Sequence, residues 1–240
     1  MRKKITYNYA RLPLKKAYNV RELGGYPAEN RKPTKYHAFL RSDNLEHLEP
    51  DDMEFLKSYG VTAAIDLRGE EEAIEHPNPF KFDDEVNYIN IPFIVDGIMD
   101  VRKQTEVGFH VAGFYRDLVD SHEKVYEIMS FILKQKGCVL FHCMAGKDRT
   151  GVVAMILLGL CGVAKEDIIA NYQVTRTYLR DHVELSLPDE LMNLNYSKPE
   201  WIEEAYDYLL EKYGSFENYL LTVGLSKKAI KNLKKRLLTN

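Results

Sequence analysis

The stretch of sequence that decides the fold runs from position 137 to position 158 and reads Gly137-Cys138-Val139-Leu140-Phe141, His142-Cys143-Met144-Ala145-Gly146-Lys147-Asp148-Arg149-Thr150-Gly151, Val152-Val153-Ala154-Met155-Ile156-Leu157-Leu158. The first group is apolar and rich in strand formers, which predicts a short buried strand. The last group is apolar all round, which is typical of a helix in the centre of a core. The polar and small residues between them therefore form a loop that leads from a buried strand into a buried helix.

This loop brings a nucleophile, a permanent cation and a helix N-terminus toward one point. The first amides of a helix have no partner within the helix and the helix dipole is positive there, so an anion binds readily. The amides of residues 144–149 are expected to surround three phosphate oxygens as a nest, and Gly146 permits the tight backbone. The pattern predicts a site for a tetrahedral dianion and cleavage of a phosphate ester through Cys143.

Each polar side chain of the loop has an expected role. Cys143 attacks phosphorus as a thiolate, a form that helix N-termini and nearby cations favour. Arg149 stays charged and can hold two phosphate oxygens at once, most strongly in the transition state. The hydroxyl of Thr150 is expected to bond the cysteine sulfur and ease its departure when water splits the phosphocysteine. His142 is expected to hold the loop through backbone hydrogen bonds.

The loop resembles the signature of the cysteine-based phosphatases, HC-x5-R-[ST]. Its fuller form, HCxxGKDRTG, resembles the bacterial atypical tyrosine and lipid phosphatases, sometimes called triple-specificity phosphatases. Further segments similar to that family are Asn19-Val20-Arg21-Glu22-Leu23-Gly24-Gly25-Tyr26, Arg41-Ser42-Asp43-Asn44-Leu45, Ile65-Asp66-Leu67-Arg68, and parts of 213–225. The resemblance implies a tyrosine-phosphatase-like α/β fold in which a central sheet is flanked by helices.

The resemblance also implies activity on phosphotyrosine, and sometimes on phosphoserine, phosphothreonine or phosphoinositides. Because the site has no metal-ligand spacing, we expect the reaction to need no metal or cofactor. It assigns the nucleophile to Cys143 and phosphate binding to Arg149. Lys147 fits a multiply phosphorylated head group as a second point charge. The candidate substrate-binding residues are Met144, Ala145, Gly146, Lys147, Thr150, Asp66 and Arg68.

The general acid that protonates the leaving oxygen is less easily placed. Many tyrosine phosphatases use an aspartate in a Trp-Pro-Asp sequence, which this chain lacks. Asp148 lies inside the loop, and the related family is thought to use the equivalent aspartate. We therefore expect Asp148 to be the acid, with Asp96 as the second candidate. The alternative is that Asp148 only neutralises Lys147.

Two charged residues follow the predicted strand 61–65. Ligands of open α/β sheets gather beyond the carboxyl ends of the strands. Asp66 is therefore a candidate to orient Arg149 through a salt bridge, and Arg68 a candidate to add positive charge. The alternative is a plain ion pair at the strand end. Asn19 and Arg21 are weaker candidates for the same pocket.

Composition predicts one domain of ordinary soluble character over residues 1–240. The chain has 240 residues, of which 45% are hydrophobic, and a formal net charge of −3. It can bury a sizeable core, and it has no general attraction for nucleic acid or anionic membranes. Three cysteines without framework spacing favour a reducing, cytoplasmic compartment. No secretory signal or membrane-spanning run is evident, although secretion without a visible signal stays open.

The rest of the chain alternates predicted helices and strands, which indicates an α/β sheet. We expect a helix ending at Gly60, strands over 61–67 and 86–91, and helical periodicity over 112–135. The segment around 184–198 is a candidate lid over the site. The last helix, 226–238, is basic on one face, which suits either solvent or a membrane surface.

The sequence thus favours a protein-tyrosine phosphatase that works through a phosphocysteine intermediate. A phosphoinositide phosphatase is the nearest alternative, supported by Lys147 and the basic last helix. A phospho-binding module without turnover is the alternative from another class, and the intact Cys143, Asp148 and Arg149 argue against it. The sequence leaves the substrate and the oligomeric state open.

Overall fold

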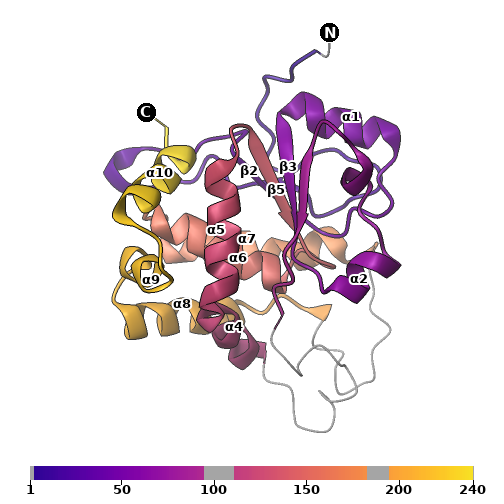
Figure 1. The fold of residues 1–240 in the computed structure, drawn as a ribbon. Helices are drawn as coiled ribbons and strands as arrows, with labels where there is room; N and C mark the ends of the chain where they lie inside the picture. The colour runs from indigo at the N-terminus through magenta and orange to yellow at the C-terminus, as the bar shows by residue number, and fades with distance from the viewer. Residues whose placement is uncertain (1–2, 95–110, 183–194, 240) are drawn as a thin grey trace, which may run out of the picture.

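A five-stranded sheet forms the centre of the computed structural model, which describes residues 3–94, 111–182 and 195–239 (Figure 1). The strand order is β1-β2-β5-β3-β4. The first strand is antiparallel to its neighbour and the other pairs are parallel. The strands are β1 (Arg21–Glu22), β2 (Phe39–Ser42), β3 (Val61–Asp66), β4 (Asn87–Asn90) and β5 (Cys138–His142).

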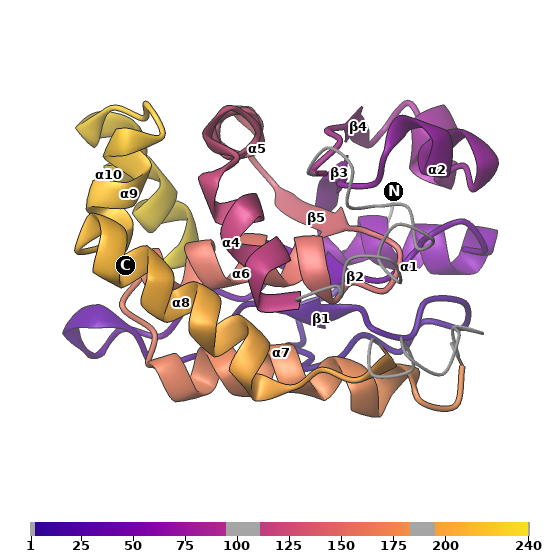
Figure 2. The same cartoon turned by 90° about the horizontal axis from the view of Figure 1, so that it is seen from below.

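Helices cover both faces of this sheet (Figures 1 and 2). One face carries α1 (Pro50–Tyr59), with α2 (Glu70–Glu75) at the adjoining edge. The other face carries α4 (Val111–Asp120), α5 (His122–Lys134), α6 (Asp148–Leu160), α7 (Lys165–Leu179), α8 (Pro199–Tyr213), α9 (Phe216–Thr222) and α10 (Lys227–Leu237). The 3-10 turns are η1 (Glu29–Arg31) and η2 (Pro79–Phe82). This architecture confirms the α/β fold with helices on both sides of a central sheet.

The alternation of side chains along β5 divides the core into two parts. Val139 and Phe141 pack into the larger cluster, which the helices α4 to α10 complete. Cys138 and Leu140 point the opposite way, into a smaller cluster under α1. A strand that is apolar at every position is what burial on both faces requires. The helix α6, apolar all round, is buried along its length and lies inside the larger cluster.

The observed boundaries differ from the expected ones at two helices. The loop helix begins at Asp148 rather than at Val152, so its first turn contains the polar end of the loop. The periodic stretch 112–135 is two helices, because Ser121 leaves helical geometry (φ −74°, ψ 62°) and starts α5. The other expected elements lie within a few residues of α1, β3, β4 and α10.

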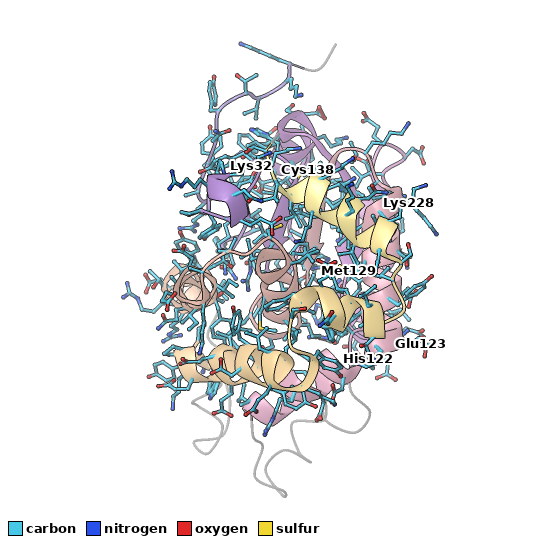
Figure 3. All side chains as sticks on the ribbon, turned by 90° about the vertical axis from the view of Figure 1, so that its left-hand side faces the viewer. Lys32, His122, Glu123, Met129, Cys138 and Lys228 are labelled. Atoms are coloured by element: carbon cyan, nitrogen blue, oxygen red, sulfur yellow. The ribbon has the colours of Figure 1, made fainter. Side chains whose placement is uncertain are left out.

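The basic C-terminal helix docks by its apolar side. Ile230, Leu233 and Leu237 are buried, whereas Lys228 and Lys231 are exposed. Figure 3 looks toward this part of the molecule and shows Lys228 at the surface. None of the helices within the described residues has the length and apolar character that a membrane span requires. Asp96 and most of the candidate lid 184–198 lie outside the described residues.

Candidate active site

The loop from Cys143 to Lys147 leaves the carboxyl end of β5, the central strand, and enters α6. Gly146 has φ +64°, a left-handed conformation that glycine adopts without strain. A Cβ at this position would lie 2.3 Å from the carbonyl oxygen of Ser42. The turn therefore depends on glycine both for its backbone conformation and for its close contact with β2.

Segments from the N-terminal part of the chain hold the carbonyl oxygens of this loop. The shortest of these hydrogen bonds are Asn44 N to Met144 O (2.8 Å), Asn19 Nδ2 to Ala145 O (2.9 Å) and Arg41 Nη2 to Gly146 O (2.6 Å). In a trans peptide the following N–H points away from the carbonyl. The amides of residues 145–147 are therefore turned away from this scaffold, as a nest for an anion requires.

Asp43 anchors the scaffold itself. Its carboxylate accepts hydrogen bonds from the backbone amides of Tyr18 and Asn19, each at 3.0 Å. These two bonds hold the segment that delivers the Asn19 side chain to the loop. Two of the segments noted in the sequence, 19–26 and 41–45, thus meet at the loop although they are far from it along the chain.

Arg149 is held by Glu72. Its Nη1 and Nη2 atoms donate to the two carboxylate oxygens of Glu72, at 2.6 and 3.0 Å. Glu72 lies in the first turn of α2 and also accepts from the amide of Gly69 at 2.8 Å. Burial alone would lower the pKa of Arg149, but the Glu72 hydrogen bonds and the neighbouring Cys143 charge raise it above its usual range. The guanidinium therefore remains charged in a fixed plane.

The expected salt bridge between Asp66 and Arg149 is wrong. Asp66 instead forms a bidentate pair with Arg68, at 2.9 and 2.6 Å, because Arg68 is two residues away and folds back on the strand end. Burial opposes ionisation, but His142 and Arg68 lower the pKa of Asp66 to about 2. The alternative reading of a strand-end ion pair holds, and Arg68 also donates to Asn44 Oδ1 at 3.0 Å.

His142 holds the loop in the way that the sequence predicts. Its Nδ1 lies 3.1 Å from the Cys143 carbonyl oxygen, and Asn78 Nδ2 lies 2.8 Å from its Nε2. The Oδ1 of Asn78 already accepts from the amide of Phe80 at 2.9 Å, so its Nδ2 must donate to the ring. This assigns the proton of the ring to Nδ1. Burial lowers the pKa of His142, which favours this neutral ring.

Asp148 stands at the edge of the site with its side chain 30% exposed. The hydroxyl of Tyr115 donates to its Oδ1 at 2.5 Å, and Tyr172 Oη lies 2.6 Å from Tyr115 Oη. Burial raises the pKa of both tyrosines well above the usual value, so both remain protonated donors. The Nζ of Lys147 is 3.4 Å from the same carboxylate oxygen. Asp148 therefore has a neutral hydroxyl donor in addition to the lysine.

Lys147 is largely buried against the start of α8. Its Nζ donates to the carbonyl oxygen of Tyr196 at 3.1 Å and lies 5.1 Å from the centre of the Trp201 ring. Both partners belong to the short segment that leads into α8 and to the first turn of that helix. The lysine charge is thus fixed beside the loop by a segment from the C-terminal third of the chain.

The expected bond between Thr150 and the cysteine sulfur is absent. Thr150 is completely buried in the first turn of α6, and its Oγ1 has no hydrogen-bond partner among the described residues. Cys143 is also buried, with 2% of its surface exposed. The contact that was expected to assist the departing sulfur is therefore not part of this structure.

Sequence reasoning missed Glu72, Asn78 and Tyr115. Glu72 is one of three consecutive glutamates at the start of α2, a pattern that is common at any helix N-terminus. Asn78 precedes a proline turn and Tyr115 lies on a helix, so neither stands in a recognisable motif. Only their proximity to the loop in space marks them.

A cysteine, an arginine and a helix N-terminus that meet beyond the central parallel strand are typical of enzymes that hydrolyse phosphate esters through a cysteine. The chain belongs to the tyrosine phosphatase family, whose sequence model matches residues 12–239. It is a protein-tyrosine phosphatase by this membership.

Relatives that are similar to this chain are also named phosphatases. The chain is 32% identical to a tyrosine-protein phosphatase of Nostoc commune over 83% of this chain and 74% of that protein. It is 21% identical to the triple specificity protein phosphatase PtpB of Mycobacterium tuberculosis over 92% of this chain and 97% of that protein. Among solved structures, the crystal structure of P. aeruginosa TpbA aligns with a TM-score of 0.42 and 14% identity, covering 87% of this chain and 92% of that one.

Proposed function

We propose that this phosphatase hydrolyses phosphotyrosine in two steps through Cys143. The Sγ thiolate attacks phosphorus, the bond to the phenolic oxygen breaks, and Asp148 gives its proton to that oxygen. Water then attacks the phosphocysteine, Asp148 takes a proton from the water, and inorganic phosphate leaves as the thiolate reforms. The observation that carries the proposal is the loop itself: its carbonyl oxygens bond the N-terminal segments, so the amides that follow them are turned away from those segments.

Arg149 is proposed to bind two equatorial phosphate oxygens. A guanidinium has five N–H donors, and Glu72 takes one from each terminal nitrogen. The remaining donors are left for a ligand in a plane that the ion pair has already set. Such preorientation reduces the cost of ordering the arginine in the transition state.

Asp148 is proposed as the general acid because it is the loop carboxylate whose side chain is partly exposed. Its Oδ1 is fixed by Tyr115 at 2.5 Å, which supports one orientation of the carboxyl group. The competing acid, Asp96, lies outside the described residues, so the two are separated by kinetics rather than geometry.

A phosphoinositide is the second candidate substrate. The favouring observation is the charge of Lys147, which sits beside the loop at 5.1 Å from the Trp201 ring. The electrostatic field of this largely buried charge would favour a head group with a further phosphate, whereas a phosphotyrosine side chain has one phosphate only. The name of the mycobacterial relative states triple specificity for that protein. Hydrolysis of phosphoserine and phosphothreonine belongs to the same proposal.

The deciding experiment measures turnover on phosphotyrosine peptides beside a phosphoserine, phosphothreonine and phosphoinositide panel. Cys143→Ser should abolish turnover of every substrate yet retain binding of the ester, because the loop amides and Arg149 remain. Appreciable turnover by a clean Cys143→Ser preparation would refute the cysteine mechanism. Wild-type protein that binds esters without hydrolysing them would instead support the phospho-binding module. A cytoplasmic location is proposed because a reducing compartment keeps the thiol free.

A further inference from the structure

Arg41, on β2, is a buried cation to which the proposed reaction has assigned no task. It is 1% exposed. Its Nη1 donates to Asn171 Oδ1 at 2.7 Å and its Nη2 to Gly146 O at 2.6 Å, with Lys147 O at 3.4 Å. All three acceptors are neutral. Its Nε is buried without a hydrogen-bond partner. The guanidinium therefore bonds the loop but keeps an uncompensated charge.

That charge needs an anion. Within the described part of the chain, no carboxylate forms an ion pair with Arg41, and a buried cation without one is costly. A second buried arginine, Arg21, lies nearby and adds repulsion. Burial lowers the pKa of Arg41 to about 10, opposed chiefly by the Cys143 thiolate. The side chain is therefore still charged near pH 7, and Cys143 is the anionic group that acts on it most strongly.

The position of Arg41 in the fold agrees with this. In the register of β2 and β5, Arg41 is paired with Phe141, two residues before the nucleophile. A Cβ built on Gly151, in the first turn of α6, would be 3.7 Å from Arg41 Nη2. The guanidinium thus lies behind the loop, between the end of the strand and the N-terminal turn of the helix.

We propose that Arg41 is a positioning residue whose positive charge, applied from behind the loop, stabilises the Cys143 thiolate and the bound substrate dianion. The inference rests on the proposed function, because the thiolate and the dianion are the anions that the charge serves. Arg41 touches neither the substrate nor the reacting atoms. Its neutral partners leave the full charge acting on the loop, whereas a carboxylate partner would cancel most of it.

Asn171→Asp tests this by supplying that carboxylate without removing a hydrogen bond. Asp keeps an oxygen in place of the Oδ1 that faces Arg41, and the Tyr26 hydroxyl, now 2.9 Å from Asn171 Nδ2, can rotate to donate. The readout is alkylation of Cys143 by iodoacetamide near pH 6, located by mass spectrometry. Iodoacetamide is neutral, so a changed field does not alter its approach.

Asn171→Asp should slow this alkylation about tenfold and weaken the binding of inorganic tungstate about tenfold, because a negative charge added beside Arg41 acts on the loop through an intermediate dielectric. The melting temperature of the variant should not fall. Asn171→Ala leaves the Arg41 charge in place and should alkylate within about twofold of wild type even if it melts earlier. Equal alkylation rates for the Asp and Ala variants would overturn the proposal. Arg41 would then only hold the loop through its hydrogen bonds.

A second pair of variants keeps the test decisive if Asn171→Asp does not fold. Arg41→Lys retains the charge with fewer hydrogen bonds, and Arg41→Met removes the charge at similar volume. Alkylation of Cys143 that is faster in Arg41→Lys than in Arg41→Met supports the proposal, and equal rates in the two variants refute it. Because alkylation needs no turnover, this comparison decides the role of Arg41 even if the wild type hydrolysed no ester, a result that would refute the proposed function separately.

Discussion

Glu72→Gln should strongly lower kcat/KM while leaving the fold intact. Glu72 is the residue that fixes the Arg149 guanidinium, through two hydrogen bonds at 2.6 and 3.0 Å. The amide of glutamine has one oxygen, so it can accept only one of these bonds, and its NH2 group then faces a second donor. The charge that holds the arginine is lost as well.

The size of the effect follows from this geometry. A hydrogen bond to a charged group contributes roughly 1.5–3 kcal/mol, and every 1.4 kcal/mol in the barrier corresponds to about tenfold in rate. Loss of one such bond from Arg149 should therefore lower kcat/KM by roughly 10- to 100-fold, because the arginine must then be ordered as the transition state forms. The loss should fall mainly on kcat, because a free arginine can still contact the ground-state phosphate.

The assay compares kcat and KM on a phosphotyrosine peptide for Glu72→Gln, wild type and Glu71→Gln. Glu71 is the exposed neighbour on α2, so its variant removes the same charge from the same helix without touching Arg149. If Glu72→Gln is folded by circular dichroism and has the same kcat/KM as Glu71→Gln, then Glu72 does not orient Arg149 for catalysis and the reasoning is refuted.

Four further predictions concern the loop and its surroundings. Arg149→Lys should be nearly as inactive as Arg149→Ala, because the planar fork matches two oxygens and a point charge does not; retention of most of the wild-type kcat/KM would contradict this. Asp148→Asn should slow esters with poor leaving groups far more than nitrophenyl esters and should lose the high-pH limb of the kcat/KM profile; an unchanged leaving-group dependence would transfer the role to Asp96, tested by the matching Asn variant. Asp66 has a folded-state pKa of about 2, below its unfolded value, so it stabilises the fold above about pH 4 and loses this contribution as the pH falls toward 2. The stability gap between wild type and Asp66→Asn in urea titrations, roughly 2 kcal/mol near neutral pH, should narrow over that range, and a pH-independent gap would refute the pairing. Activity should survive EDTA and be lost to vanadate or to mild peroxide, with thiols reversing the peroxide damage at Cys143; loss on chelation that a divalent ion restores would contradict the metal-free mechanism.

Local pattern was sufficient for the central strand, the loop and the buried helix behind it. The apolar runs 137–141 and 152–158 indicate burial directly, since a segment that is buried on every side has few polar residues. The candidate nucleophile, the arginine and the loop aspartate stand within seven consecutive residues, so their proximity needs no tertiary information. The break at Ser121 was missed because the apolar periodicity of α4 continues into α5 across it.

What the sequence by itself determined is therefore the nucleophile, the cation and the helix N-terminus, because covalent connection already brings them together. What only the tertiary structure decided is which side chains hold them. Glu72 rather than Asp66 pairs with Arg149, and Arg41 from β2 reaches the carbonyl of Gly146. These partners lie 77 and 105 positions away along the chain. Their ion pair and hydrogen bond depend on short distances that only the packing of helices on the sheet sets.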